Sequence, residues 1–520
     1  MARSKPVGLY SPEARRELQE FRKQRLHHTV GSTVLLLLYL ALGLAVTIVT
    51  VVLLNPYLPI YVYVATGLTI AMCVIAFRYI YFYWCLIRYW GDFHRHNHLD
   101  LEALMARDWP NLKFQVTTKG GALETVERSV AELEQFCYRH PEKANRISAE
   151  IITERRDEAV ALDQRFAGGP LEVTAVLLPP AYEAPRGTRL KARALHYMVE
   201  LRRGGFNRKP GRSFIVHLDD ETLITDDQLL VLADYLSDQP KAVSEGPIYY
   251  PLDWTQAPWI CRTMESIRPF GCSECAHVMQ NPPPTHLHGS NLVIDEEVEN
   301  LVGWDLGLVE GQAYIAEDLV FGLTTYAAVG DGGFGWHGAA MLEQPPFSLY
   351  WAFRQRQRWV LGALQGTQAL WCNPDFAGLR RRQKVKLHVS IVYRVLTYSL
   401  GFPVGLGGLM FLIRNILTGT LSPQQHFYVS IWTVLMAISG VAWLLSYQVG
   451  LARNLQYQRL SLPRRLQQHL VVLLLTPVAG LAETIGPFTA GLKWILGLRR
   501  VSWTPTLKVS TAAPVVRATP

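Results

Sequence analysis

The sequence lacks the signals of several protein classes. Its 520 residues contain no internal repeat and no low-complexity tract, so nothing in them indicates a repeat architecture. No RNA- or DNA-binding motif is present either. The formal charge is +8, from 51 basic and 43 acidic residues, but the basic excess is concentrated beside apolar segments. We therefore expect membrane lipids, with their anionic headgroups, to be the partners of these basic residues, and we expect no nucleic-acid partner.

Cysteine is scarce. The seven cysteines are an odd number, and most lie in the part that we expect to face the cytoplasm, so we predict free thiols. Cys272 and Cys275, with His277, His286 and His288 nearby, have the residue types of a zinc site. A single Cys-x-x-Cys without a second well-spaced pair is not enough to predict zinc, however, and the sequence leaves open whether these cysteines bind metal.

Apolar residues are too abundant for a wholly soluble protein. They make up 49% of the chain, with 14 tryptophans, which indicates a membrane protein with a large aqueous domain. A basic N-terminus, 1–28, precedes the uncharged stretch 29–54. This stretch is longer than the apolar part of a signal peptide and lacks a small-residue cleavage site, so we predict a retained helix. Because residues 58–77 return the chain, we predict two transmembrane helices within 29–90.

Basic residues flank both outer ends of these two helices. The positive-inside rule then places 1–28 and the region after Trp90 in the cytoplasm. Residues 91–386 are soluble in character, with short apolar strands alternating with amphipathic stretches, as in the βαβ units of a mainly parallel sheet. The predicted strands are 112–117, 146–152, 171–178, 213–218 and 242–250. We therefore predict a cytoplasmic α/β domain in a multi-pass integral membrane protein.

The C-terminal part, 387–498, is apolar again. Residues 388–400 could lie at the membrane interface before 401–417 crosses, or the two could form one long tilted span. Residues 427–451 predict a further span.

The last apolar stretch, 470–498, contains Pro477 and Pro487 and has basic residues on both flanks. This pattern favours a re-entrant hairpin over a full crossing, because a hairpin returns the chain to the basic side. We therefore predict that the tail, 499–520, is cytoplasmic.

A buried strand ends in three acidic residues, Asp219, Asp220 and Glu221. In an open α/β sheet ligands collect at the carboxyl ends of strands, and hard oxygen ligands there suit Mg²⁺ or Mn²⁺ that also contacts a diphosphate. The alternative is an acidic surface loop in which Thr222 or Thr225 caps the next helix. These residues alone do not decide between the two.

Two helix starts carry charges. The loop from Gly187 opens into a helix with Lys191 and Arg193 near its beginning, where cations are disfavoured unless an anion such as phosphate binds there too. A solvated basic helix is the alternative. Glu317 and Asp318 begin an apolar helix, where N-capping is the alternative explanation for a single Asp.

A third motif is Gln355-Arg356-Gln357-Arg358-Trp359. Arginine pairs bidentately with phosphate oxygens, and tryptophan stacks on sugar faces or shields a site from water. The alternative is an ordinary basic run beside the membrane.

Taken in order, these motifs resemble the membrane-embedded family-2 glycosyltransferases, which include the cellulose, chitin and hyaluronan synthases. Within that group the sequence is most similar to the Egghead-type β-1,4-mannosyltransferases. The resemblance covers roughly 113–365. The stretches that carry it are 116–120, 190–195, 215–223, 315–318, and 346–348 leading to 355–359.

The resemblance implies a GT-A fold and inverting displacement at the anomeric carbon of a nucleotide sugar. Asp219 and Glu221 would hold Mg²⁺ or Mn²⁺, with Glu221 departing from the usual second Asp. Asp318 would be the general base, with Glu317 beside it. The implied donor-binding residues are Glu154, Lys191, Asp219, Asp220, Gln355, Arg356 and Arg358. The implied acceptor-binding residues are Gly289, Ser290, Asn291 and Trp359.

The resemblance also implies the partners, a nucleotide-sugar donor and a lipid-linked or glycan acceptor. We expect transfer of a hexose to a membrane glycolipid, with mannose from GDP-mannose as the expected donor and a β-linkage in the product. One alternative is a processive polysaccharide synthase that uses a UDP-sugar and exports its product, although about four crossings are few for a channel. Another is a catalytically inactive glycolipid-binding protein, against which the full set of converging charges argues.

Overall fold

The computed structural model describes residues 60–238, 240–418 and 423–498. Within this part the central element is a seven-stranded sheet with the order β10-β5-β7-β4-β1-β2-β3. Its strands are β1 (Asn111–Thr117), β2 (Ile147–Thr153), β3 (Glu172–Leu177), β4 (Ser213–Asp219), β5 (Val243–Glu245), β7 (Leu292–Asp295) and β10 (Phe334–Trp336). Strand β7 runs antiparallel to β4 and β5, and the other pairs are parallel. The sheet is mixed but mainly parallel, and the predicted α/β fold is confirmed.

Four short strands form two smaller sheets. These strands are β6 (Ile248–Tyr249), which pairs with β11 (Met341–Leu342), and β8 (Leu308–Val309), which pairs with β9 (Gln312–Ala313).

Helices cover both faces of the central sheet. The apolar residues of α5 and α8 pack against β1, β2 and β4 on one face, whereas α7, α10 and α12 pack against β5, β7 and β10 on the other. The domain helices are α3 (Trp90–Phe93), α4 (Leu101–Ala106), α5 (Leu123–Arg139), α6 (Arg156–Phe166), α7 (Lys191–Arg203), α8 (Asp226–Asp238), α9 (Trp259–Ser266), α10 (Arg268–Gln280), α11 (Glu296–Val302), α12 (Glu317–Val329) and α13 (Leu349–Cys372).

The strand register positions the site. In the parallel pair of β1 and β4, Thr117 lies opposite Asp219, and in the pair of β1 and β2 it lies opposite Ile152. The three strands therefore end at the same edge of the sheet, where a ligand site of an α/β domain is expected.

Four of the five predicted strands are confirmed to within one residue at each end, as β1 to β4. The fifth prediction, a single strand over 242–250, is wrong, because β5 and β6 belong to different sheets. Gly246 and Pro247 separate them. Proline has no N–H to donate to a ladder, and a Cβ at Gly246 would lie 2.2 Å from the carbonyl oxygen of Ala339.

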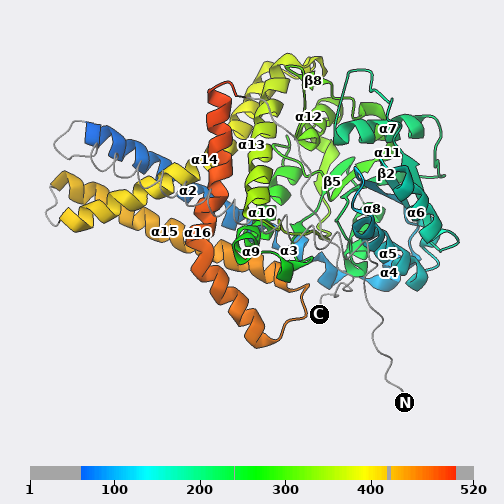
Figure 1. Cartoon of the computed structure of the whole chain (residues 1–520), viewed down its shortest axis with the longest axis horizontal. Coiled ribbons are helices and arrows are strands. Elements are labelled where there is room, and N and C mark those ends of the chain that lie inside the picture. The colour runs from blue at the N-terminus through cyan, green and yellow to red at the C-terminus, as the bar shows by residue number, and fades with distance from the viewer. Residues whose placement is uncertain (1–59, 239, 419–422, 499–520) are drawn as a thin grey trace.

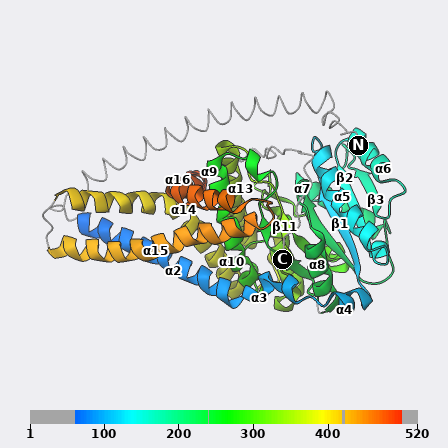
Figure 2. The same cartoon turned by 90° about the horizontal axis from the view of Figure 1, so that it is seen from below.

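Long helices extend from the sheet domain. Figure 1 and Figure 2 show α2, α14 and α15 running side by side away from it. The long helices are α2 (Ile60–Arg88), α14 (Arg381–Thr418), α15 (Pro423–Leu455) and α16 (Leu462–Ile495). In the described residues, the four segments long and apolar enough to cross a membrane are Thr69–Arg88, Arg381–Gly408, Ser430–Leu455 and Leu462–Ile495. These helices support membrane association.

The predictions for the individual membrane helices agree with the structure to different extents. The first, 29–54, lies outside the described residues, as does the tail 499–520. The second, 58–77, corresponds to α2, but this helix continues beyond the predicted end to Arg88. Of the two alternatives for 388–417, one long helix is confirmed by α14.

The re-entrant hairpin predicted for 470–498 is wrong. Helix α16 continues through Pro477 and Pro487, and Figure 1 shows it bent rather than reversed. Proline removes one backbone hydrogen bond and bends a helix, but it does not reverse the chain when packed neighbours support the helix.

Candidate active site

The first turn of α12 carries the predicted general base. The N-cap position is Ala316, so Asp318 lies inside the helix and does not cap it through its side chain. Its Oδ1 accepts a hydrogen bond from the backbone N–H of Leu319 at 2.8 Å. Burial, followed by the neighbouring charge of Glu317, raises the pKa of Asp318 to about 7. A carboxylate with a pKa near neutrality is well suited to accept a proton at physiological pH.

Lys191 connects several elements of the site from the start of α7. Its Nζ donates to the carboxylate of Asp219, at the end of β4, and to the carbonyl oxygen of Gly289 at 3.0 Å. Burial disfavours the ammonium, but Asp219, Glu317 and Asp318 together raise the pKa of Lys191 above its usual value. The cation predicted to meet a phosphate therefore lies among the carboxylates of the site.

The predicted acceptor loop has two parts. A Cβ on Gly289 would lie 3.3 Å from Lys191 Nζ and 3.4 Å from Asp318 Oδ2, so the loop backbone approaches the charged groups closely. Ser290 and Asn291 are buried. The backbone of Gly289 thus contacts Lys191 directly.

The side chains of Ser290 and Asn291 make contacts within the protein. Ser290 Oγ donates to the carboxylate of Glu343. Asn291, at a φ of 56°, donates through Nδ2 to the carbonyl oxygens of Pro247 at 2.8 Å and Ala339 at 3.0 Å. These contacts hold the loop in place.

The turn after β4 contains the predicted metal ligands. The side chain of Asp219 is 39% exposed, whereas Glu221 is buried. Thr222 Oγ1 accepts from the backbone N–H of Asp219 at 3.2 Å and donates to Glu343 at 3.2 Å, so Thr222 stabilises this turn. Asp220 lies in the same turn and is half-buried.

The charges around this turn fit a divalent cation. Asp219, Glu317 and Asp318 interact electrostatically with Lys191, and Arg358 interacts with two of the three carboxylates. Three carboxylates facing two cations leave an excess of hard oxygen donors, which Mg²⁺ and Mn²⁺ prefer.

Helix α13 contributes Arg358 and Gln355. Burial lowers the pKa of Arg358, while the charges of Glu317 and Asp219 act in the opposite direction, so its guanidinium lies near those carboxylates. Gln355 Oε1 is buried, with no hydrogen-bond partner in the described part of the chain.

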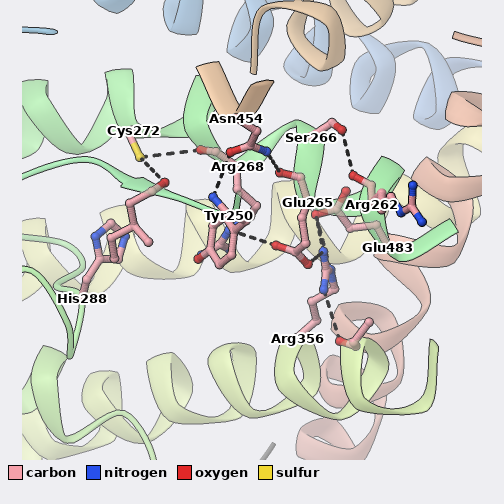
Figure 3. A network of polar contacts seen from close by, with 12 residues as sticks. Tyr250, Arg262, Glu265, Ser266, Arg268, Cys272, His288, Arg356, Asn454 and Glu483 are labelled. Atoms are coloured by element: carbon pink, nitrogen blue, oxygen red, sulfur yellow. Dashed lines mark hydrogen bonds and ion pairs between the residues drawn. The ribbon is translucent and has the colours of Figure 1, made fainter. Parts of the chain in front are cut away.

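Arg356 lies in a different cluster, which Figure 3 shows. The side chain is fully buried; its Nη2 donates to Glu265 on α9 at 2.8 Å, and its Nε donates to Glu483 on α16 at 3.4 Å. Tyr447 also donates to Glu483, at 2.9 Å. The prediction that Arg356 binds the donor is thus corrected, because two carboxylates of the protein already occupy its guanidinium.

Trp359 borders this buried cluster. The guanidinium of Arg268 lies over its ring at 4.1 Å, and that of Arg356 at 5.7 Å. Sequence reasoning missed Arg268, Glu265 and Glu483. Glu265 and Arg268 are only three residues apart, but Arg356 and Glu483 come from helices that are distant in the chain, and no local pattern marks the members of the cluster as partners.

Glu154 lies just after β2, at the same edge of the sheet as Asp219. Its carboxylate pairs with Arg193 of α7 at 3.0 Å, and both side chains are partly exposed. The structure thus provides an anion for Arg193 within the protein.

All seven cysteines lie in the described residues and none of them forms a disulfide, which confirms the predicted thiols. Of the Cys-x-x-Cys pair, Cys275 lies near His286 and His288. Cys272 instead donates to the backbone carbonyls of Ile248 and Arg268, and His277 contacts Tyr89.

Comparison with known proteins finds a family match for the central part of the chain. Residues 214–447 match the family described as "Glycosyl transferase family group 2". The β-1,4-mannosyltransferase bre-3 of Caenorhabditis briggsae is 28% identical over 259 residues, covering 49% of this chain and 52% of that protein. The β-1,4-mannosyltransferase egh of Drosophila melanogaster is 26% identical over 258 residues, with the same coverage of each chain. The chain thus matches about half the length of these relatives.

Among solved structures, the chain aligns with the crystal structure of S. aureus TarS 1-349 in complex with UDP. The TM-score is 0.31 at 10% identity, with 78% of this chain and 99% of that chain covered. The resemblance to Egghead-type family-2 glycosyltransferases predicted from the sequence is confirmed by the family and relatives that match.

Proposed function

We propose that this chain, whose residues 214–447 form a family-2 glycosyltransferase domain, transfers a hexose with inversion from a nucleotide sugar to a membrane glycolipid. The observation that carries the proposal is the convergence of Asp318, Lys191, Asp219 and Arg358. One site then offers both a base and the cations that a diphosphate needs. As donor we propose GDP-mannose with a β-linked product, because the relatives are named β-1,4-mannosyltransferases.

In this reaction Asp318 removes the proton of the acceptor hydroxyl. The hydroxyl oxygen forms a bond to the anomeric carbon from the face opposite the diphosphate, and the bond from that carbon to the diphosphate oxygen breaks. The nucleoside diphosphate leaves with the electron pair, so the configuration inverts. A base with a pKa of about 7 is ionised in a large fraction of molecules at neutral pH.

Protein cations offset the charge that develops on the leaving diphosphate. Lys191 and Arg358 lie beside the end of β4, where the diphosphate would bind, and Gln355 faces inward on the same helix as Arg358. Prepositioned charges in a partly dry site stabilise the transition state more than they would in water. Asp219 and Glu221 would hold Mg²⁺ or Mn²⁺, which neutralises diphosphate charge when bound.

The acceptor side lies towards the long apolar helices. Trp359 is on α13, which α16 contacts through Arg356 and Glu483. This contact supports an acceptor whose lipid part stays in the membrane while its sugar reaches Asp318. The basic residues that flank the apolar segments support a cytoplasmic orientation of the catalytic domain.

The test is a donor screen with the purified full-length chain in detergent. Release of nucleoside diphosphate would be measured with GDP-mannose and with UDP-sugars, each with and without a glycolipid acceptor. We expect acceptor-dependent release from GDP-mannose and a product longer by one sugar. The Asp318→Asn variant is the matched control. No release from any donor by the folded wild type would contradict the proposal, release from a UDP-sugar alone would correct the donor, and a polymeric product would favour a processive synthase.

A further inference from the structure

A cysteine and two histidines meet beside the candidate active site, outside the groups assigned to the reaction. Cys275 is on α10, and His286 and His288 are in the segment that follows it. Their ligand atoms lie within 4.8 Å of one another, and Cys275 Sγ is 3.7 Å from His288 Nε2. Tetrahedral zinc, with bonds of about 2.3 Å to sulfur and about 2.0 Å to nitrogen, separates two such ligand atoms by about 3.5 Å. The observed distance fits a shared ion.

The surroundings of His288 match those of a metal ligand. Its Nδ1 is buried without a hydrogen-bond partner in the described residues, and it faces the Glu245 carboxylate at 3.8 Å. Metal-bound histidines commonly direct their second ring nitrogen to a carboxylate.

We propose that Cys275, His286 and His288 bind one Zn²⁺ ion. Zinc prefers imidazole nitrogens and thiolate sulfurs as ligands. Because zinc is usually four-coordinate, these three protein ligands leave one position for water. The Cys275 thiol must lose its proton on binding, because zinc binds the thiolate form of cysteine. Zinc uptake therefore releases a proton from Cys275. The ion is separate from the one expected at Asp219 and Glu221.

Arg394 contacts the third proposed ligand, His286, and thereby sets the tautomer of its imidazole ring in this structure. Its guanidinium contacts His286 Nδ1, and it pairs with Glu274 at 3.3 Å. A guanidinium can only donate, so this contact needs a lone pair on Nδ1 and a proton on Nε2. His286 Nε2 is buried and has no partner in the described residues; to bind zinc through it, the ring must take the other tautomer. Arg394 then leaves His286 and keeps Glu274 as its partner.

The position of this site suggests what the ion does. His288 directly precedes Gly289, whose carbonyl oxygen accepts the hydrogen bond from Lys191. An ion bound to His288 would fix the loop that contains Gly289. Lys191 and Asp318 both lie against this loop, so the ion would also help to fix the distance between them. The zinc site is therefore a positioning device beside the reacting groups, and no bond-making step involves it.

Zinc content of the purified full-length chain tests the proposal. The chain would be purified in detergent and dialysed against Zn²⁺ at low concentration. Elemental mass spectrometry should then find about one zinc ion per chain. The Cys275→Ser and His288→Ala variants should each lose at least about tenfold in zinc affinity. Cys137→Ser, at a buried cysteine of α5, is the matched control and should keep the wild-type zinc content. Cys272→Ser should also keep it, because Cys272 is not a ligand.

Two outcomes would overturn the site. One is a wild-type chain that takes up no zinc, and the other is a Cys275→Ser or His288→Ala variant that retains the wild-type affinity. If these variants fail to fold, the wild-type chain can be titrated with Co²⁺ instead, a test that requires no substitution. A thiolate-to-cobalt charge-transfer band is expected, and a spectrum without this band contradicts a cysteine ligand. Loss of zinc in Cys272→Ser alone would assign the ion to the other cysteine and refute this ligand set.

Discussion

Arg356 and Arg358 are two residues apart on α13, yet they lie in opposite environments. Side chains at such a spacing point to different sides of a helix. Arg356 is fully buried between Glu265 and Glu483, whereas Arg358 is half-buried near the carboxylates at the end of β4. One arginine thus connects the helix to α16, and the other faces the candidate reaction site. A basic motif does not by itself say which of its members bind a ligand.

The two clusters also differ in how their charges balance. The Arg356 cluster joins two carboxylates, Glu265 and Glu483, to the guanidiniums of Arg356 and Arg268. Around Lys191, three carboxylates face two cations. A balanced cluster holds elements together, whereas an unbalanced one has capacity for a metal ion or a charged substrate. The predictions below test this distinction.

The largest effect is expected for Asp318→Asn. Asparagine is close in shape but cannot accept the proton, so the rate of transfer should fall about 10²- to 10⁴-fold. Thermal stability and donor binding, measured by calorimetry, should stay near those of the wild type. Near-normal transfer by this variant would remove Asp318 as the base and direct attention to Glu317.

Arg356→Met should act on stability. It leaves Glu483 buried without a guanidinium partner and Glu265 with Arg268 alone, and breaking a buried ion pair in this way typically costs about 3–5 kcal/mol. We expect a clearly lower unfolding temperature in detergent. A variant that unfolds like the wild type but no longer binds donor would show that Arg356 belongs with Arg358 after all.

Removal of the divalent ion should affect only the unbalanced cluster. Stripping the chain with a chelator should lower transfer by about 10²-fold or more, because a cation supplies several kcal/mol of charge stabilisation. Added Mg²⁺ or Mn²⁺, with Zn²⁺ resupplied at low concentration for the Cys275 site, should restore activity, and Asp219→Ala should prevent that recovery. Full activity in the chelator, or an Asp219→Ala variant with an unchanged rate, would refute a metal at this turn.

Arg358→Lys keeps the charge but loses the planar fork. We expect kcat to fall about tenfold or more while KM for the donor changes less, because bidentate contacts matter most as the diphosphate leaves. The same substitution at Arg356 is the matched control, with its main effect on stability. Wild-type kcat in Arg358→Lys would remove the bidentate role.

The smallest expected effect is a shift in pH dependence. Burial and then Glu317 raise the pKa of Asp318 to about 7, and the base must be ionised to act. The kcat/KM value should therefore be at its plateau above pH 7 and decline as the pH falls below it. Glu317→Gln removes the neighbouring negative charge, so the decline should move to lower pH. A profile that stays in place would show that Glu317 does not influence the base.

Much of the fold follows from local patterns. The apolar runs of β1 to β4 predict strands, and the predicted helix starts near Lys191 and Glu317 are confirmed. The region 242–250 shows where such reasoning fails. Its apolar character continues across Gly246 and Pro247, but the close approach of Ala339 comes from a distant segment. The residue pattern of 242–250 alone cannot predict that Ala339 lies so close to Gly246.

The candidate site divides in the same way. The sequence by itself determined the acidic turn after β4, the acidic pair that begins α12 and the arginines of α13, because each depends on residue types within a few positions. Only the tertiary structure decided that Arg356 pairs with Glu265 and Glu483, and that Cys275 meets His286 and His288. It also decided that α16 is one bent helix. The physical reason is that a charge or a thiol can be satisfied by any suitable partner, and packing between distant helices selects which one.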